Sequence, residues 1–252
     1  MESVAEFIQH IGKKMPLKSS SPTSKVKNKV LASPYFKPDR NFYKGERLRL
    51  KSTTFQSQKE VQNEDVLIPV PDILDYDLRV LFVGINGGIT SSRKGHHFAS
   101  PTNHFWPCLS GSGLVDRKLT FEDDTLLPKS YGIGFTNLTS RVSRRATDLT
   151  IDEQRANIPQ LTQKIRQYKP TWVAFVGIGI YQIYSGEKKV VAGLQETTIA
   201  WPQGSGSSKV YVMPSTSGLV AAYHKKDKMK YFVELGHLVN GTHVDLSLQE
   251  AN

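Results

Sequence analysis

From about residue 65 onward, hydrophobic and polar positions follow two alternating periods, which predict strands interleaved with helices. Short apolar, β-branched runs of strand length lie at 80–85, 133–137, 172–176 and 210–213. Apolar positions recur at helical spacing in segments that begin near Asn103, after Thr150 and after Gly177, and from Lys225 to Leu238. This alternation predicts a three-layer α/β/α domain with a central, mainly parallel sheet of four to five strands.

Two local signals place one helical segment more closely. Thr150 is a plausible N-cap, and it is followed by Asp152 and Glu153 in the first turn, where the helix dipole favours acidic groups. Pro159 then falls inside the apolar pattern, so we expect the helix to kink or to restart there.

The chain before residue 65 has a different pattern. Val4, Phe7, Ile8 and Ile11 are spaced for a short amphipathic helix, which we expect to dock on the domain or to bind a partner. Residues 15–63 are rich in Ser, Lys, Asn and Gln, which predicts a largely disordered segment. We therefore divide the chain into an arm (1–64), a folded domain (65–240) and a C-terminal tail (241–252).

Charge is unevenly distributed between these parts. Residues 1–60 hold 13 Lys and Arg against 5 Asp and Glu, a net of +8, which leaves about +2 of the total +10 for the rest. A basic arm before a near-neutral domain is typical of an electrostatic contact with a polyanion, although a merely solvated tail gives the same count.

Cysteine usage and the N-terminal residues limit the cellular compartments in which we expect the protein. The single cysteine, Cys108, excludes an internal disulfide and fits a reducing compartment. No run reaches 18 apolar residues, so we expect no membrane span. Glu2 and Glu6 lie where a secretory or mitochondrial signal would be basic or apolar, which argues against both.

The first candidate site follows the first predicted strand. There the chain reads Gly84-Ile85-Asn86-Gly87-Gly88, and glycines permit tight turns and positive φ angles that let backbone approach a ligand. Loops at the carboxyl ends of parallel strands form the ligand crevice of such sheets. The glycine spacing matches neither a dinucleotide-binding GxGxxG nor a P-loop, which disfavours a generic nucleotide-binding protein.

The second candidate site follows the last predicted strand. Residues 213–220 read MPSTSGLV and precede a helix, so their hydroxyl and N–H groups are placed to grip phosphates. Basic residues follow in the next helix; they predict further phosphate contacts or, as the alternative, a solvated helix face: His224, Lys225, Lys226 and Lys228.

Four blocks in this order resemble the mismatch-specific uracil/thymine DNA glycosylases, family 2 of the uracil-DNA glycosylase superfamily. The family's first motif reads G-I-N-P-G, which residues 84–88 match except at Gly87. The likeness continues over roughly Pro71 to Leu235. It runs through KGHHF at 94–98 with Pro101 and NHFW at 103–106, YGIGFTN at 131–137, and MPSTS at 213–217 with Asp227-Lys228.

The resemblance implies a role for each block. Asn86 would orient the hydrolytic water, which suits an oxocarbenium-like reaction that needs only a weak nucleophile. The base pocket would consist of Gly84, Ile85, Gly88, Ser91, His97, Phe98 and Asn103, with Phe98 stacking on the extruded base. Phosphate gripping and insertion into the vacated stack would fall to Ser215, Thr216, Ser217, Gly218, Leu219, Lys225 and Lys226.

Three positions depart from the family pattern. Gly87 replaces the motif's proline, which predicts a looser water site. Leu219 stands where many relatives have arginine, so strict preference for an opposite guanine is in doubt. Ile178 stands where lysine is common. One cysteine and no paired spacing disfavour zinc ligation by His96, His97 and His104, and we expect no metal or cofactor.

The function implied is excision of uracil, with thymine and other damaged or deaminated bases as a wider range, from mismatched duplex DNA by a monomeric nuclear enzyme. Hydrolysis would leave an abasic site, and the 84–88 turn has no lysine for a Schiff-base lyase step. The alternative from another class is a non-catalytic reader of mismatches or damage on the same fold. The Gly87 and Leu219 departures motivate that alternative.

Overall fold

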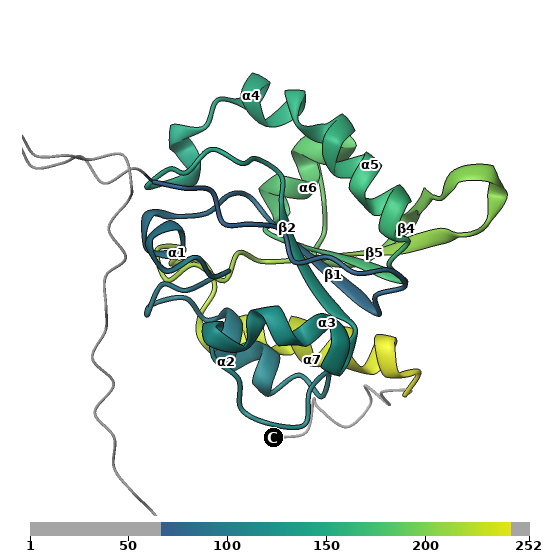
Figure 1. Cartoon of the computed structure of the whole chain (residues 1–252), viewed down its shortest axis with the longest axis horizontal. Coiled ribbons are helices and arrows are strands. Elements are labelled where there is room, and N and C mark those ends of the chain that lie inside the picture. Colours follow the sequence, from purple (N-terminus) through teal and green to yellow (C-terminus); the bar gives the residue numbers. More distant parts are fainter. Residues whose placement is uncertain (1–66, 243–252) are drawn as a thin grey trace, which may run out of the picture. The chain divides into compact units, whose positions relative to one another are not determined.

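The computed structural model describes residues 67–242, and its elements alternate along the chain as the hydrophobic pattern predicts (Figure 1). The strands are β1 (Val80–Gly84), β2 (Ile133–Asn137), β3 (Trp172–Val176), β4 (Gly193–Ala200) and β5 (Ser207–Met213). The α-helices are α1 (Ile89–Lys94), α2 (Phe105–Ser110), α3 (Leu127–Tyr131), α4 (Ile151–Ala156), α5 (Ile158–Tyr168), α6 (Ile178–Ser185) and α7 (Lys225–Asn240). Short 3₁₀ turns lie at η1 (Phe121–Leu126), η2 (Ala146–Asp148) and η3 (Pro202–Gly204).

The strands form one sheet in the order β2-β1-β3-β5-β4. The β1–β2, β1–β3 and β3–β5 pairs are parallel, and only β4 runs antiparallel, against β5. Since parallel strands end at the same edge, the loops after β1, β2, β3 and β5 meet there. That edge carries both candidate sites.

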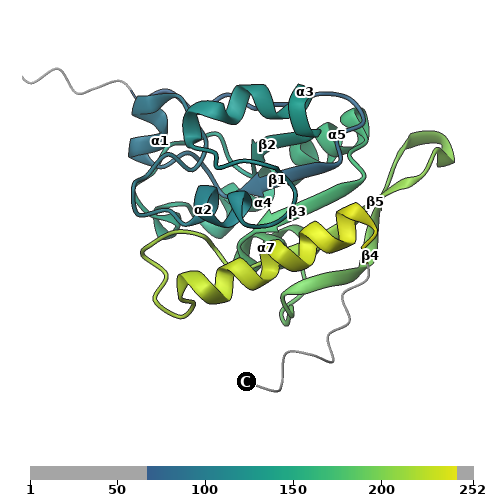
Figure 2. The same cartoon turned by 90° about the horizontal axis from the view of Figure 1, so that it is seen from below.

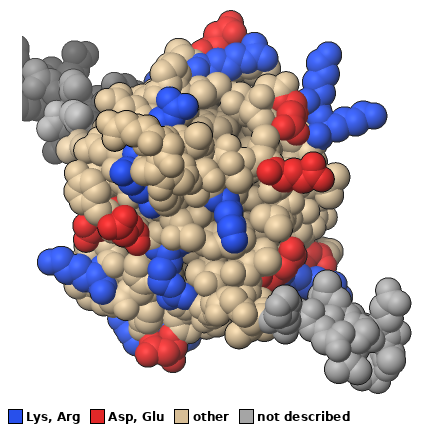
Figure 3. All heavy atoms as spheres, turned by 90° about the vertical axis from the view of Figure 1, so that its right-hand side faces the viewer, with Lys and Arg blue, Asp and Glu red and all other residues tan. Residues whose placement is uncertain are grey.

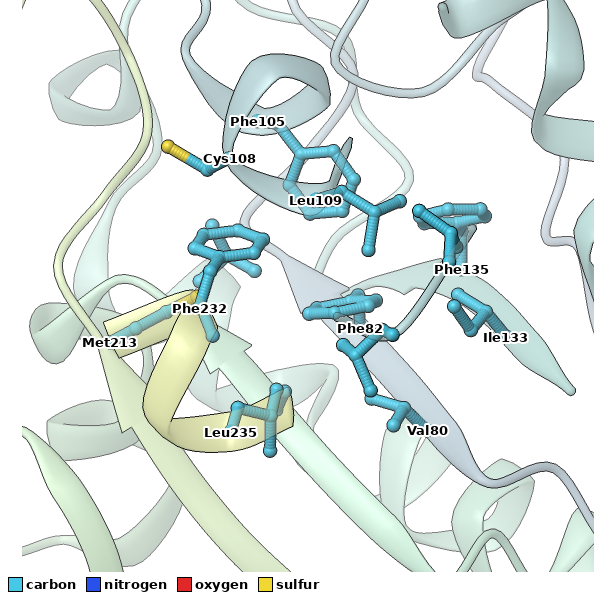
Figure 4. Packing of buried hydrophobic residues seen from close by; sticks show 14 of the residues in the cluster. Val80, Phe82, Phe105, Cys108, Leu109, Ile133, Phe135, Met213, Phe232 and Leu235 are labelled. Carbon is cyan, nitrogen blue, oxygen red and sulfur yellow. The ribbon is translucent and has the colours of Figure 1, made fainter. Parts of the chain in front are cut away.

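Helices cover both faces of the sheet, which confirms the three-layer α/β/α prediction. In Figure 1 α4, α5 and α6 lie on one side of the sheet and α2, α3 and α7 on the other, and Figure 2 shows α7 running along its own face. Each face buries a separate apolar cluster. The α2/α7 side is built on Phe82, Phe105, Phe135 and Phe232 (Figure 4), and the α5/α6 side on Val83, Phe175 and Ile165.

The aromatic cluster fixes the layer that carries the histidine loop. Phe82 of β1 meets Phe105 of α2 edge-on, with ring centroids 5.0 Å apart, and Phe232 of α7 packs at 5.9 Å. Edge-to-face pairs of this kind contribute about 0.5–1.5 kcal/mol beyond the area they bury. The residues between β1 and α2 are therefore held at both ends by one packed core.

Several expected boundaries agree with the structure. Thr150 caps α4 by accepting a hydrogen bond from the Glu153 N–H, and the pattern around Pro159 is a restart, because α4 ends at Ala156 and α5 begins at Ile158. Three elements were not expected: α1 within the histidine-bearing loop, α3 just before β2, and the edge strand β4. Among residues 67–242, no helix is long and apolar enough to cross a membrane.

The predicted arm with its helix at residues 4–11 lies outside the described residues, as does the C-terminal tail beyond residue 242. The domain limits therefore stay a prediction. On the side at the right of Figure 1, basic and acidic side chains are interspersed (Figure 3), so no single sign of charge dominates that face.

Candidate active site

Asn86 is held by the segment that follows β2. Its Nδ2 donates to the Arg141 carbonyl over 2.9 Å and to the Ser143 hydroxyl over 2.8 Å. The Ser143 hydroxyl donates onward to the Arg145 carbonyl over 2.7 Å, so it can only accept from Asn86. Both partners are thus acceptors, which fixes the amide with its nitrogen toward the protein. Among residues 67–242 no donor is hydrogen-bonded to Oδ1, so this atom can accept a hydrogen bond from water.

The segment behind Asn86 is itself anchored. Arg141 donates from Nε to a Glu153 carboxylate oxygen over 2.5 Å and from a terminal nitrogen to the Asp148 carbonyl over 2.7 Å. The hydrogen bond from Arg141 holds the pKa of Glu153 below its usual range. One of the two residues that accept from the Asn86 amide, Arg141, is therefore tied to α4, outside the turn that carries the amide.

The glycines of the 84–88 turn do not use the positive φ that glycine permits, and two of them instead lie where a side chain would have little room. A Cβ on Gly84 would lie 2.6 Å from Asn137 Oδ1 and 3.5 Å from Phe98 Cζ. A Cβ on Gly87 would lie 3.0 Å from Val70 Cγ2. Gly87 is buried under Val70, which is a packing reason for glycine at this position.

Phe98 has a strained backbone and a fixed ring. Its φ of 53° lies in the left-handed region, which costs a bulky residue of order 1–3 kcal/mol and tends to occur at functional sites. Its ring stacks on Phe105 with centroids 4.0 Å apart and planes 7° apart. This contact leaves Phe98 half-buried beside Gly84, as a pocket wall requires.

His97 supports the pocket from behind. It is buried, its Nε2–H donates to the Pro71 carbonyl over 2.8 Å, and its ring stacks on Phe135 at 5.3 Å. Burial lowers the pKa of His97, so the neutral ring is favoured. Both neighbouring histidines also contact Asp124, which accepts from the His97 N–H over 2.9 Å and lies 2.9 Å from His96 Nδ1.

The other predicted pocket residues divide between the two sides of the sheet. Ser91 is buried and accepts from the Ala99 N–H over 3.1 Å, and Gly88 is the N-cap residue of α1. Asn103 uses its carbonyl oxygen to accept from the Phe105 N–H over 3.0 Å at the start of α2. The Ile85 side chain packs in the α5/α6-side cluster, away from Phe98, so only its backbone is available to the pocket.

The loop after β5 packs against the start of α2. Thr216, which is buried, accepts at its carbonyl from the His104 N–H over 2.9 Å, and a Cβ on Gly218 would lie 2.5 Å from the Thr102 carbonyl. Ser215 and Ser217 hydroxyls accept weakly from N–H groups two residues on, each at 3.3 Å, which leaves their O–H groups free to donate. Leu219 is 79% exposed at the tip.

The lysines of α7 do not share one environment. Lys225 and Lys226 are exposed, as phosphate contacts require, but Lys228 is only 1% exposed. Its Nζ donates to the Ser217 carbonyl over 2.9 Å and lies 3.5 Å from His104 Nδ1. The expectation that Lys228 belongs with the surface lysines was therefore wrong.

A polar cavity of about 130 Å³ opens beside the 84–88 turn. It is lined by Val70, Asp72, Gly87, Asn137, Leu138, Thr139, Ser140, Gln160 and Lys164. It borders the Asn86 turn but lies toward α5, and neither Asn86 nor Phe98 lines it. Asp72 closes its side by accepting from the Thr136 hydroxyl over 2.7 Å and by pairing with Lys164 at 2.5 Å.

Sequence reasoning missed Ser143, Asp124 and Asn137 as members of the site. Asn137 ends the YGIGFTN block and so was named there, but only the structure brings its amide against Gly84. Ser143 and Asp124 lie in stretches without a motif, and their contacts span 57 and 27 residues of sequence. In the part of the chain that the structure describes, no three His, Cys, Asp or Glu side chains are grouped for a metal ion.

This chain is similar in sequence to a curated glycosylase and in fold to a solved structure. The G/U mismatch-specific uracil DNA glycosylase of Schizosaccharomyces pombe (strain 972 / ATCC 24843) is 34% identical over 200 residues, which are 76% of this chain and 59% of the relative. The chain therefore spans less than two thirds of that relative's length. A solution NMR structure assigned as a uracil DNA glycosylase from Methanosarcina acetivorans is similar over 68% of this chain and 98% of that one, with 15% identity and a TM-score of 0.42.

A family model covers the region that holds both candidate loops. Residues 71–235 match the model of the uracil DNA glycosylase superfamily, from the segment before β1 into α7. The matched range includes Asn86, Phe98 and the Ser215–Leu219 loop. The chain belongs to the uracil DNA glycosylase superfamily.

Proposed function

We propose that this protein is a monofunctional DNA glycosylase that hydrolyses the N-glycosidic bond of uracil in mismatched duplex DNA and leaves an abasic site. The observation that carries the proposal is the orientation of Asn86. Its amide nitrogen donates to the Arg141 carbonyl and the Ser143 hydroxyl, which supports the oxygen as the acceptor for water. The name of the S. pombe relative supports uracil in a G·U mismatch as the first substrate to test.

The chemistry follows from these groups. Once the base has left the stack and entered the space beside Phe98, water held on Asn86 Oδ1 would approach the anomeric carbon of the sugar. A carboxamide is a weak base, but an oxocarbenium-like transition state needs little nucleophilic assistance, and most of the rate then comes from positioning and electrostatics. Asn137 lies within contact of Gly84 and is available to hydrogen-bond the base edge.

Base flipping, thymine excision, a monomeric state and a nuclear location belong to this proposal. Flipping is required because the glycosidic bond of a stacked base is not accessible to Asn86. The exposed Leu219 supports it, since an apolar side chain can fill the vacated position. A partner for the helix at residues 4–11 remains part of the proposal and lies outside the described residues.

The alternative, a non-catalytic reader, is favoured only by the departures at Gly87 and Leu219. The structure gives Gly87 a packing reason in Val70. Leu219 still supplies an apolar side chain that can fill the position vacated by the flipped base. Neither departure removes the hydrogen bonds that orient Asn86.

One assay decides between the two. Purified protein in excess is incubated with G·U, G·T and A·U duplexes, and abasic sites are cleaved with alkali. We expect product from G·U, and a rate on the order of 10²-fold lower or more in Asn86→Ala, the typical scale for removing a positioned catalytic group. Tight binding to every duplex with no product from any of them would establish the reader instead.

A further inference from the structure

Lys228 is a buried ammonium-bearing side chain with no carboxylate partner among residues 67–242. It is 1% exposed on the inner side of α7, and its polar neighbours are the Ser217 carbonyl at 2.9 Å and His104 Nδ1 at 3.5 Å. Burying a cation without a counter-charge costs several kcal/mol, and a methionine of similar length would pack there at much lower cost. Burial accordingly lowers the pKa of Lys228.

The groups that Lys228 contacts belong to the DNA-facing loop and its support. Ser217 lies two residues before the exposed Leu219, and His104 donates its own N–H to Thr216 over 2.9 Å. Lys228 therefore joins α7, the start of α2 and the loop after β5 at one point. Among the described residues, the other hydrogen bonds of this loop at Ser217 and Leu219 are weak, at 3.3 Å.

Removing the ammonium group would not leave an orphaned backbone carbonyl. Ser217 O also accepts from the Val220 N–H at 3.3 Å, and His104 is only half-buried, so water can replace the lost donor at Nδ1. A purely structural reason for this lysine is therefore weak. What it supplies is a fixed position for the Ser217 backbone, and with it for the Leu219 side chain.

We propose that Lys228 is a positioning residue. Its hydrogen bond to the Ser217 carbonyl would clamp the Ser215–Leu219 loop onto α7, so that Leu219 is already in position when it enters the DNA stack. The proposal rests on the proposed function, because it assumes that this loop meets duplex DNA. Preorganisation of this kind removes an ordering cost from the binding step. If Leu219 were mobile, its conformational entropy would be lost each time the base is flipped.

The test compares Lys228→Met with Lys230→Met, an exposed lysine on the same helix. Each variant is measured for thermal unfolding and for single-turnover excision from a G·U duplex at saturating protein. We expect Lys228→Met to keep or raise the melting temperature, because a buried charge is removed, and to excise about tenfold more slowly, the scale of one lost charge-assisted hydrogen bond. Lys230→Met should match the wild type in both measurements.

A double-mutant cycle shows whether Lys228 acts through the wedge. Leu219→Ala should slow excision strongly in the wild-type background and by less than about threefold in Lys228→Met, because an unclamped leucine contributes little. A fluorescent 2-aminopurine next to the uracil should report weaker unstacking in Lys228→Met and in Leu219→Ala alike.

The outcomes separate the two proposals. A wild type that excises no base from any duplex refutes the proposed function. A wild type that excises uracil while Lys228→Met excises at the same rate overturns the clamp alone. Equal effects of Leu219→Ala in the two backgrounds also overturn it, as does a lowered melting temperature that accounts for the lost rate.

Discussion

Asn86 and Ser143, which are 57 residues apart in sequence, share a hydrogen bond of 2.8 Å in which the amide nitrogen donates and the hydroxyl accepts. The hydroxyl proton is already committed to the Arg145 carbonyl at 2.7 Å. The direction of these two hydrogen bonds places the nitrogen of the carboxamide, and not its oxygen, toward Ser143. Ser143, together with the Arg141 carbonyl, therefore orients the group that would hold the water.

We expect Ser143→Ala to slow single-turnover excision of uracil by about three- to tenfold, because one hydrogen bond of about 1 kcal/mol is lost while the one to Arg141 O remains. Binding to the duplex should not change. Ser143→Thr, which keeps the hydroxyl, should recover most of the rate, and Ser140→Ala on the exposed part of the same segment serves as the control. An unchanged rate in Ser143→Ala would mean that Arg141 O alone orients the amide.

Leu219 should affect the reaction without affecting the fold. Because its side chain is 79% exposed, we expect Leu219→Ala to leave the melting temperature within about 1 °C of the wild type. Burying a leucine in the stack contributes about 1.5–3 kcal/mol before ordering costs, so excision from a G·U duplex should slow by about tenfold or more.

Leu219→Arg tests the base opposite. An arginine at this tip can hydrogen-bond the orphaned partner base, which leucine cannot. The ratio of excision rates between G·U and A·U duplexes should therefore rise in Leu219→Arg. A ratio equal to that of the wild type would show that this position does not read the opposite base.

The sheet could be predicted from sequence because its strands are buried apolar runs, whereas β4 could not. Residues 193–200 read GLQETTIA and are largely exposed, so this edge strand has no run of core residues to reveal it. The first helix was missed for a similar reason, since α1 has six residues and buries only Ser91. Pairing with β5 and packing on the turn create these elements, and neither is a local property of the sequence.

The candidate site was predictable where a motif carries it and not where contacts span the chain. Asn86 and Phe98 lie in motif blocks. Lys228 lies in one too, but its burial follows from where the loop after β5 packs, so the spacing of basic residues placed it wrongly at the surface. The looser water site at Gly87 stays a prediction, and only the structure shows that Val70 occupies the space a side chain there would need.

Cys108 should resist thiol reagents in the native protein. Burial raises the pKa of its thiol to about 11, so at pH 8 only about one thiol in a thousand would be the reactive thiolate. Iodoacetamide alkylation followed by mass spectrometry should show little labelling until the protein is denatured. Labelling should increase as pH rises toward 11, since the thiolate forms only as that pKa is approached. Rapid native labelling at pH 8 would indicate that α2 opens locally.

Substitutions at Val70 and Gly87 should partly offset each other in their effects on the free energy of unfolding. A Cβ at position 87 would lie 3.0 Å from Val70 Cγ2, so Gly87→Pro, which restores the motif's proline, should overpack this contact and cost about 1 kcal/mol of unfolding free energy. Val70→Ala removes the obstructing methyl group, so the double variant should be more stable than the sum of the two single changes predicts. Urea unfolding of the four proteins measures this coupling.

The same variants test whether the family's proline makes the water site more rigid. If it does, Gly87→Pro with Val70→Ala should also excise uracil faster than Val70→Ala alone. Equal rates would show that glycine at position 87 does not lower the rate of excision.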